Sequence, residues 1–226
     1  MTDSLIVTKN LIKDYLIRGK SVRALNNVDI EIKKGEFAAI TGHSGSGKST
    51  LLRIIGGLEH PDSGQCLFDG QDVYSLTDKS RSLMRAIKIG FIFQAFNLIP
   101  QMTLLENTLL PFLYNETEIN DTKERAITAL KQVGLEDRIN HRPSELSGGE
   151  QQRGAIARAI VINPEIILAD EPTGNLDGET SKEILSLFIE LHKRGTTILL
   201  VTHNNDAAAC AQRIITLRQG EIANTG

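Results

Sequence analysis

Nine consecutive residues have the types and spacing needed to hold a polyphosphate. Residues 42–50 read Gly-His-Ser-Gly-Ser-Gly-Lys-Ser-Thr and fit the pattern G-x-x-x-x-G-K-[ST] at every fixed position. Glycines lack a Cβ and adopt positive φ, so such a loop can wrap closely around phosphates and turn its N–H groups inward. Lys48 can then reach the β- and γ-phosphates, and the Ser49 hydroxyl can bind Mg²⁺. The predicted phosphate-binding residues are Gly42, Ser44, Gly45, Ser46, Gly47, Lys48, Ser49 and Thr50.

Two carboxylates form a second group with a chemical role. Asp170 and Glu171 directly follow the apolar run at residues 166–169, which predicts a buried strand that ends at these side chains. In a chain with a phosphate loop, Asp170 would help to hold Mg²⁺ through its second coordination shell, and Glu171 would polarise the attacking water. The alternative is a pair of solvated carboxylates, which the buried run before them disfavours.

A histidine follows a third apolar run in the same way. His203 comes after residues 197–202, which predict another buried strand. Such a histidine is ordinarily a packing or surface residue. Because the carboxyl ends of parallel strands meet at one edge, a contact with the γ-phosphate is favoured here.

The elements that must position these groups alternate between strands and helices. This alternation predicts an α/β fold with a mostly parallel sheet covered by helices, and an antiparallel β piece near the N-terminus. A ligand is expected at the strand ends, and the local chemistry is that of a Mg-ATP hydrolase. The predicted strands are residues 5–7, 28–32, 37–41, 66–68, 89–93, 166–169, 197–202, 214–217 and 221–222; helices are predicted from residue 51 and at residues 80–87, 148–162 and 179–194.

One stretch has helical periodicity and no convincing strand. Residues 105–113, 123–134 and 136–139 predict helices, and residues 115–118 a polar linker. We therefore predict one domain, 1–226, in which 1–94 and 164–226 form the α/β core. Residues 95–163 would be an inserted helical subdomain.

The loop at residues 94–102 is unusually apolar. It begins at Gln94 and carries Phe96, Leu98, Ile99 and Met102 with no charged residue. Such a loop is either buried or a docking surface, and the sequence leaves both open.

Two further positions also have two interpretations. Ser147, Gly148 and Gly149 open a helix, so Ser147 is either an ordinary N-cap or part of a second anion site. Tyr15 is predicted on a polar loop before the phosphate loop, where it either stacks on adenine or packs half-exposed on the core.

The composition of the chain limits the classes of partner and of cellular environment that we expect for it. The 226 residues carry a formal net charge of −3 with no Lys/Arg run of the kind that tracks a phosphate backbone, so nucleic acid is not expected as a partner. Cys66 and Cys210 have no metal-ligand spacing and are expected to be reduced packing residues. The N-terminus lacks the features of a signal peptide, and no apolar run approaches the ~18 residues of a membrane span. Any membrane role would therefore be peripheral, through another chain.

The motifs taken together resemble one family. Residues 146–153, Leu-Ser-Gly-Gly-Glu-Gln-Gln-Arg, resemble the signature motif of ABC-type ATPases, and their Ser147 lies 23 residues before Asp170. The other motifs of that family follow in order over nearly the whole chain. Residues 89–100 and 173–177 are most similar to the lipoprotein-release and macrolide-export (LolD/MacB) type. The matching positions are Tyr15 for adenine stacking, Gln94 for the Q-loop, Asp170 and Glu171 for the Walker B aspartate and catalytic glutamate, Asp177 for the D-loop and His203 for the switch histidine.

The resemblance implies ATP and Mg²⁺ as cofactors, sandwiched between two copies of the chain. Ser147 and Gly149 of one copy would cap the γ-phosphate held by Lys48 of the other. The implied roles are catalytic for Glu171, His203, Gln94 and Lys48; metal-binding for Ser49, Gln94 and Asp170; and nucleotide-binding for Tyr15, the phosphate loop, Ser147, Gly148, Gly149 and Asp177.

The implied partner is a separately encoded transmembrane permease subunit that docks near residues 94–102. The ATPase homodimer would then be cytoplasmic and peripheral on the inner face of the cell membrane. It would drive export, lipoprotein release or mechanical signalling. The alternative is a soluble ABC-type clamp acting on DNA or the ribosome, but the coiled coils, zinc modules or second ATPase copy usual in such proteins are not visible. Two positions depart from the family, Gly154 and Asn204, where an aliphatic residue and Asp are more usual.

Overall fold

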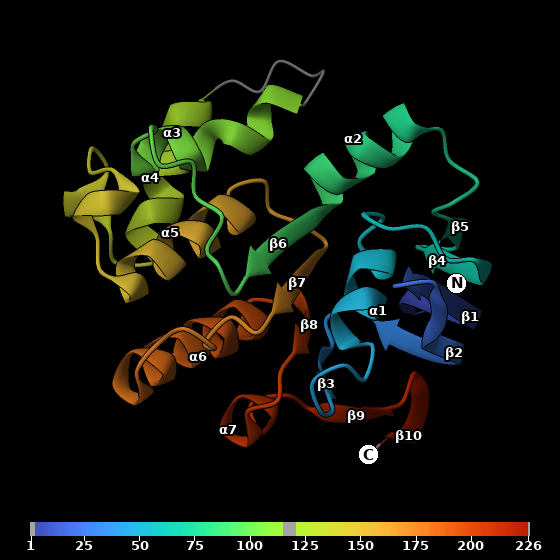
Figure 1. The fold of residues 1–226 in the computed structure, drawn as a ribbon. Helices are drawn as coiled ribbons and strands as arrows, with labels where there is room; N and C mark the ends of the chain where they lie inside the picture. The colour runs from blue at the N-terminus through green and yellow to red at the C-terminus, as the bar shows by residue number, and fades with distance from the viewer. Residues whose placement is uncertain (1–2, 115–120, 226) are drawn as a thin grey trace. The chain divides into compact units, whose positions relative to one another are not determined.

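The computed structural model describes residues 3–114 and 121–225 and divides into two compact units (Figure 1). The first unit combines Met1–Ser82 with Thr197–Gly226, and the second is Leu83–Thr196. The elements of the first unit are β1 (Ser4–Ile17), β2 (Lys20–Lys33), β3 (Phe37–Thr41), α1 (Lys48–Ile55), β4 (Ser63–Phe68), β5 (Gln71–Asp72), β8 (Thr197–Val201), α7 (Asn205–Ala208), β9 (Arg213–Arg218) and β10 (Glu221–Thr225).

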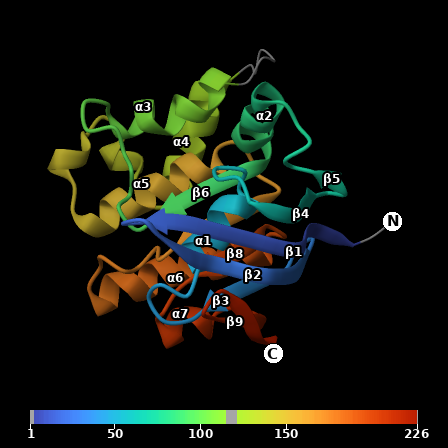
Figure 2. The same cartoon turned by 45° about the vertical axis from the view of Figure 1, so that its right-hand side comes forward.

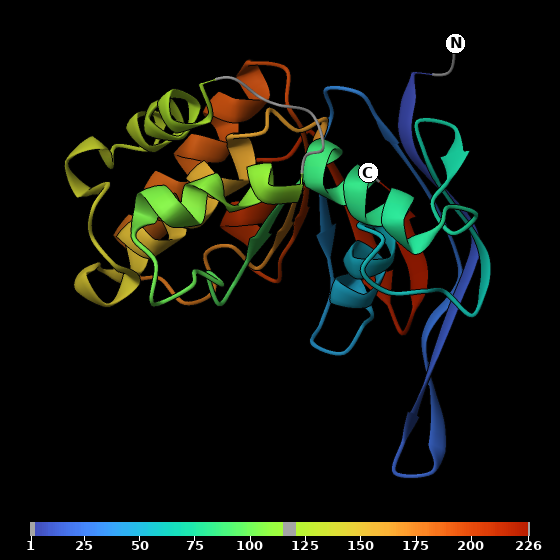
Figure 3. The same cartoon turned by 90° about the horizontal axis from the view of Figure 1, so that it is seen from above.

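An antiparallel sheet forms one part of the first unit, as predicted. Its strand order is β2-β1-β4-β5, and β1 pairs with β2 in register Ile6↔Ile32 and Thr8↔Ile30. Val28, Ile30 and Ile32 are buried while the residues between them are exposed, which is the alternation of a half-buried strand. The turn between β1 and β2 extends well clear of the rest of this unit when it is seen from above (Figure 3).

Parallel strands form the other part of the first unit. β3 pairs in parallel with β8 on one side and β9 on the other, and β10 closes the end antiparallel to β9. Every residue of β8 is buried, and so are the first four of β3. Covered parallel strands have this continuous apolar character, and each fully buried large aliphatic side chain contributes about 1.5–3 kcal/mol.

The second unit holds most of the helices (Figure 2), and its parallel strands β6 and β7 are labelled in Figure 1. β6 and β7 are parallel, with Ile92 opposite Ala169. Helices α3, α4 and α5 pack against one another. The elements are α2 (Asp78–Lys88), which begins before the boundary, β6 (Ile89–Phe93), α3 (Leu104–Leu109), η1 (Leu110–Tyr114), α4 (Thr122–Gln132), η2 (Glu136–Arg138), η3 (Pro143–Glu145), α5 (Gly148–Ile160), β7 (Ile166–Asp170) and α6 (Gly178–Lys193).

Gly154 and Asn204, the two positions that depart from the family pattern, each have a local structural explanation. A Cβ at Gly154 would lie 2.6 Å from Leu104 Cδ2, so glycine lets α3 pack closely on α5. Asn204 is the N-cap of α7, and its side-chain oxygen accepts from Asp206 N at 2.8 Å and Ala207 N at 3.2 Å. Asparagine serves this capping role as well as aspartate does.

Several sequence expectations need correction. Tyr15 lies within β1, so its assignment to a loop was wrong. The single helix predicted at residues 105–113 is divided into α3 and η1, because Pro111 lacks the N–H that would continue the α-helical hydrogen bonds. The short elements β5 and α7 were not predicted. The polar linker predicted at residues 115–118 lies outside the described residues, and the 95–163 subdomain stays a prediction.

Two expectations about side chains and membranes can also be compared with the structure. Cys66 and Cys210 are both free thiols, not joined in a disulfide. Cys66 is buried in β4, and this burial raises the pKa of its thiol to about 12. In the part of the chain that the structure describes, no helix is both long and apolar enough to cross a membrane.

Candidate functional site

The phosphate loop joins β3 to α1 in the first unit, the strand–loop–helix context its motif requires. Gly42, Gly45 and Gly47 all have positive φ, at 153°, 77° and 102°. Gly47 is the N-cap of α1 and offers no side-chain oxygen to cap it. The N-terminus of α1, with the positive end of its dipole and no side-chain cap, is therefore suited to an anion.

Two of these glycines are also required by close packing. A Cβ at Gly42 would lie 2.3 Å from the backbone oxygen of Leu217, and one at Gly47 would lie 2.3 Å from that of Ala24. Real Cβ atoms essentially never approach a backbone oxygen so closely. The loop therefore needs glycine for its shape as well as for ligand approach.

Lys48 is buried against the loop that it follows. Its Nζ donates to the carbonyl oxygens of Gly42, at 2.8 Å, and His43, at 3.0 Å. These bonds fold the ammonium group back over the loop. Ser46 Oγ is buried and finds no hydrogen-bond partner among the described residues, a costly state for a hydroxyl that a ligand could relieve.

Two other predicted nucleotide contacts belong to this unit. His203 is exposed and lies just after β8, separated from the end of that strand by Thr202 alone. Tyr15 is half-buried in β1, and its hydroxyl lies 3.3 Å from the Oγ1 of Thr50, on the first turn of α1. The first unit thus holds the phosphate loop, Tyr15 and His203.

Asp170 and Glu171 mark the end of β7 in the second unit, as the apolar run predicts. Glu171 has a φ of 47°, and Gly174 N donates to the Glu171 carbonyl oxygen at 3.0 Å. The left-handed backbone conformation is unfavourable for a glutamate, and the interactions of the surrounding turn must offset its cost in free energy. The hydrogen bond from Gly174 N holds Glu171 in this turn.

Gln94 is tied to the loop that follows Glu171. Its Nε2 donates to Asn175 Oδ1 at 3.0 Å, and Asn175 Nδ2 donates back to the Gln94 carbonyl oxygen at 2.9 Å. A Cβ at Gly174 would lie 2.8 Å from Gln94 Nε2, so glycine permits this approach. With its amide nitrogen engaged, Gln94 keeps an amide oxygen of the kind that binds Mg²⁺.

Ser147 caps α5 in a reciprocal capping box. Its Oγ accepts from Glu150 N at 3.3 Å, while Ser147 N donates to Glu150 Oε2 at 2.8 Å. The bonds from Ser147 lower the pKa of the Glu150 carboxyl. The N-cap interpretation is therefore correct, and a phosphate contact by Ser147 would be an additional role.

Gly149 and Asp177 both have structural roles at helix α6. A Cβ at Gly149 would lie 2.4 Å from Thr180 Cγ2, so the glycine admits α6. Asp177 caps α6 by accepting from Thr180 N at 2.9 Å and Glu179 N at 3.0 Å. Hydrogen bonds from Thr180, the largest cause, and from Glu179 lower the pKa of Asp177, which keeps it ionised.

Two residues that sequence analysis missed connect these motifs. Asn175 pairs with Gln94, as described above. Gln152 is fully buried on α5, and its Nε2 donates to the Pro172 carbonyl oxygen at 2.6 Å. Their positions inside the D-loop and signature motifs were the available signal, but neither partner was evident from the sequence.

The expected Mg²⁺ ligands fit the ion by their chemistry. Ser49, Gln94 and Asp170 offer a hydroxyl, an amide oxygen and a carboxylate, the hard oxygen donors that Mg²⁺ prefers. Ser49 belongs to the first unit and the other two to the second. Among residues 3–114 and 121–225, no three or more His, Cys, Asp or Glu side chains gather as a metal site would require.

Comparison with known proteins identifies the family. Residues 25–174 match the family model described as ABC transporter. The chain is 48% identical over 219 residues to the lipoprotein-releasing system ATP-binding protein LolD of Syntrophus aciditrophicus (strain SB), covering 96% of this chain and 98% of that protein. It is 49% identical to the macrolide export ATP-binding/permease protein MacB of Chlorobium phaeobacteroides (strain DSM 266 / SMG 266 / 2430), covering 94% of this chain but 32% of that longer protein.

A solved structure supports the same conclusion. The dimeric post-hydrolysis state of the ATP-binding cassette MJ0796, bound to ADP and Pi, has a TM-score of 0.90 and 43% sequence identity. The match covers 98% of this chain and 97% of that one. The chain therefore belongs to the ABC transporter family, as one of its ABC-type ATPase subunits.

Proposed function

We propose that this chain binds and hydrolyses Mg-ATP to drive a separate membrane subunit. The observation that carries the proposal is the phosphate loop, in which three positive-φ glycines and Lys48 lead into an α1 N-terminus without a side-chain cap. Gly42, Ser44, Gly45, Ser46, Gly47, Lys48, Ser49 and Thr50 would hold the phosphates, and Tyr15 the adenine. Steady-state ATPase activity of the purified protein, with and without Mg²⁺, tests the proposal.

The chemical step needs an activated water and a stabilised γ-phosphate. Glu171 would act as the general base, and Gln94 and His203 would contact the attacking water and the γ-phosphate. Mg²⁺, held by Ser49, Gln94 and Asp170, would neutralise charge on the phosphates when bound. The strained backbone at Glu171 supports its role, because strain of this kind clusters at functional sites.

The active unit would be a homodimer with shared sites. In the dimeric MJ0796 relative, ADP and Pi are bound. We propose that Ser147, Gly148, Gly149 and Asp177 of one copy complete the site whose phosphate loop lies in the other. The helix that Ser147 caps presents the N-terminal N–H groups such a role requires.

Mixing two inactive variants tests this arrangement. Lys48→Ala removes the phosphate-binding ammonium, and Ser147→Arg blocks the N-terminus of α5, so each homodimer should be inactive. In the mixed dimer both lesions fall at one site, and the other site has wild-type residues from both copies. We expect a measurable part of the wild-type ATPase rate to return on mixing, limited by how strongly the two sites depend on each other.

The matched control mixes Lys48→Ala with Glu171→Gln. Under the proposed arrangement these lesions fall in different sites, so this mixture should stay inactive. Heterodimers that form, as shown by differently tagged copies, but recover no activity in the first mixture would contradict shared sites.

The apolar loop at residues 94–102 is the proposed docking surface for the membrane subunit. Ile99 is 37% exposed, and the side chains of Phe96 and Leu98 are less exposed, being half-buried. A Cβ on α5 at Gly148 would come 3.7 Å from Phe96, and one at Gly154 would come 3.6 Å from Leu98. Phe96 and Leu98 are therefore partly covered by α5, and Ile99 is the side chain of this loop most available to a partner.

We expect Ile99→Asp to spare basal ATPase and reduce association with membranes by at least tenfold. A charge at the centre of an apolar contact is costly to desolvate, but at an exposed position it leaves the fold intact. The assay measures the protein that sediments with membranes of cells expressing it, beside basal ATPase and melting temperature. Ile214→Asp is the matched control, since Ile214 is 36% exposed on β9. Equal sedimentation of both variants would argue against docking at this loop.

The relatives support this partner and this location. The MacB relative carries ATP-binding and permease parts in one protein, whereas LolD matches this chain over 98% of its own length. We propose that a separate permease supplies the membrane part, and that this chain acts at the cytoplasmic face. A role as a soluble clamp on DNA or the ribosome has no supporting observation in the structure.

A further inference from the structure

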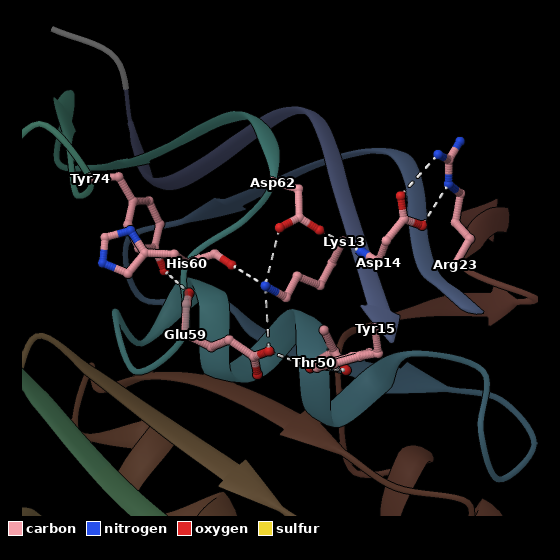
Figure 4. Close-up of polar contacts among 9 residues, drawn as sticks. All are labelled: Lys13, Asp14, Tyr15, Arg23, Thr50, Glu59, His60, Asp62 and Tyr74. Carbon is pink, nitrogen blue, oxygen red and sulfur yellow. Dashed lines mark hydrogen bonds and ion pairs between the residues drawn. The ribbon is translucent and has the colours of Figure 1, made fainter. Parts of the chain in front are cut away.

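The hydroxyl of Tyr15 is held on two sides within the first unit (Figure 4). Tyr15 Oη donates to Glu59 Oε1 at 2.5 Å and lies 3.3 Å from Thr50 Oγ1. Because the Tyr15 proton is directed to Glu59, the Thr50 hydroxyl is the donor in the second bond. Burial, and then the bond to Glu59, raise the pKa of Tyr15, so the phenol stays protonated and remains a donor at neutral pH.

Glu59 is itself held in place. It lies on the turn between α1 and β4, where Tyr74 Oη is 2.5 Å from the carbonyl oxygens of both Ile54 and Glu59. The ring of Tyr74 packs on His60, with centroids 4.8 Å apart. These contacts fix the backbone from which the Glu59 carboxylate reaches Tyr15.

Lys13 completes the cluster from β1. Its Nζ donates to the His60 carbonyl oxygen at 2.8 Å and lies 3.4 Å from Asp62 Oδ1 and 3.8 Å from Glu59 Oε1. The same ammonium group lies over the Tyr15 ring, 5.6 Å from its centroid. Lys13 therefore offsets the charge of Glu59 and occupies one face of the ring, so a base would stack on the other face.

We propose that Glu59 is a positioning residue for nucleobase recognition, which it serves by fixing the Tyr15 ring before ATP arrives. This inference rests on the proposed function, in which Tyr15 stacks on adenine. A ring held in its binding orientation loses less conformational entropy when the base binds. Thr50 ties the same hydroxyl to the first turn of α1, so the aromatic platform is also set at a fixed distance from the phosphate loop.

The test separates base recognition from phosphate binding. Isothermal titration measures the Kd of Mg-ATP and of Mg-tripolyphosphate, which has the phosphates but no base. We expect Glu59→Ala to raise the Kd of Mg-ATP about 3- to 10-fold and to leave tripolyphosphate binding unchanged. The effect is smaller than the loss of a whole charge-assisted hydrogen bond, because Glu59 acts on the base only through Tyr15. Glu59→Gln should restore ATP affinity, because its amide oxygen still accepts from the Tyr15 hydroxyl.

Controls distinguish the possible failures. Glu165→Ala removes a carboxylate that pairs with Lys88 at 3.0 Å and makes no contact with Tyr15, so it should not change ATP affinity. Equal weakening of both ligands by Glu59→Ala, or no change in either, would overturn the inference. If Tyr15→Ala itself leaves ATP affinity unchanged, the adenine role in the proposed function fails; if Tyr15→Ala weakens ATP binding and Glu59→Ala does not, only the positioning role fails.

Discussion

Glu171→Gln is expected to lower steady-state ATP turnover by roughly 10²- to 10⁴-fold, the usual contribution of a general base. The amide has nearly the shape of the carboxylate and leaves the backbone bond between Gly174 and residue 171 in place. It cannot accept the proton of the attacking water. The phosphate loop and Lys48 are unaffected, so the Kd of ATP should stay within a few-fold of the wild-type value.

A second measurement and a matched control accompany the turnover assay. With ATP present, the variant should accumulate as a dimer on size exclusion, because hydrolysis no longer opens the shared sites. Glu179→Gln is the matched control: Glu179 is an exposed carboxylate in the first turn of α6, and its replacement should leave turnover unchanged. Near-normal turnover in Glu171→Gln would remove this residue from the role of base.

Gly47→Ala is expected to abolish measurable ATP binding and to lower the melting temperature. The new Cβ would meet the Ala24 carbonyl oxygen at 2.3 Å in a backbone conformation with a φ of 102°. Clash and strain together should cost about 2–5 kcal/mol. For a chain of this size that corresponds to roughly 5–15 °C in melting temperature.

Gly19→Ala separates the two effects. Gly19 also has a positive φ, 77°, but no atom lies within 4 Å of the Cβ position, and it is in the exposed turn between β1 and β2. The control should lose only about 1–2 kcal/mol from strain and keep its ATPase activity. Equal destabilisation of the two variants would mean that the contact with Ala24 yields easily and that strain alone explains the effect.

The parts of the site that could be predicted from sequence are those encoded by neighbouring residues. The phosphate loop, the strand before Asp170 and the helix after Ser147 each depend on local pattern, and each is present where expected. Contacts between distant residues were not accessible, because no local pattern records them. The pair of Gln94 and Asn175 is separated by 81 positions and was therefore missed.

The error at Tyr15 has a different physical cause. β1 contains register shifts between Thr8 and Leu11, between Leu11 and Lys13, and between Lys13 and Asp14. Each irregularity interrupts the alternation of buried and exposed side chains by which a strand is recognised. The end of the strand therefore resembles a polar loop in sequence, although it pairs with β2 as far as Ile17.

The shape of the proposed docking loop depends on residues outside it as well as on its own backbone hydrogen bonds. Phe96 and Asn97 have φ values of 60° and 53°, and the guanidinium of Arg158 on α5 donates to both of their carbonyl oxygens, at 3.0 Å and 2.5 Å. Asn107 on α3 holds the next turn, bonding the Ile99 N–H at 2.7 Å and the Ile99 and Met102 carbonyl oxygens at 3.1 Å and 3.2 Å. In a chimera between cassettes, the transplantable module is therefore the loop together with these two side chains. Residues 94–102 moved alone would arrive without the scaffold that gives them their form.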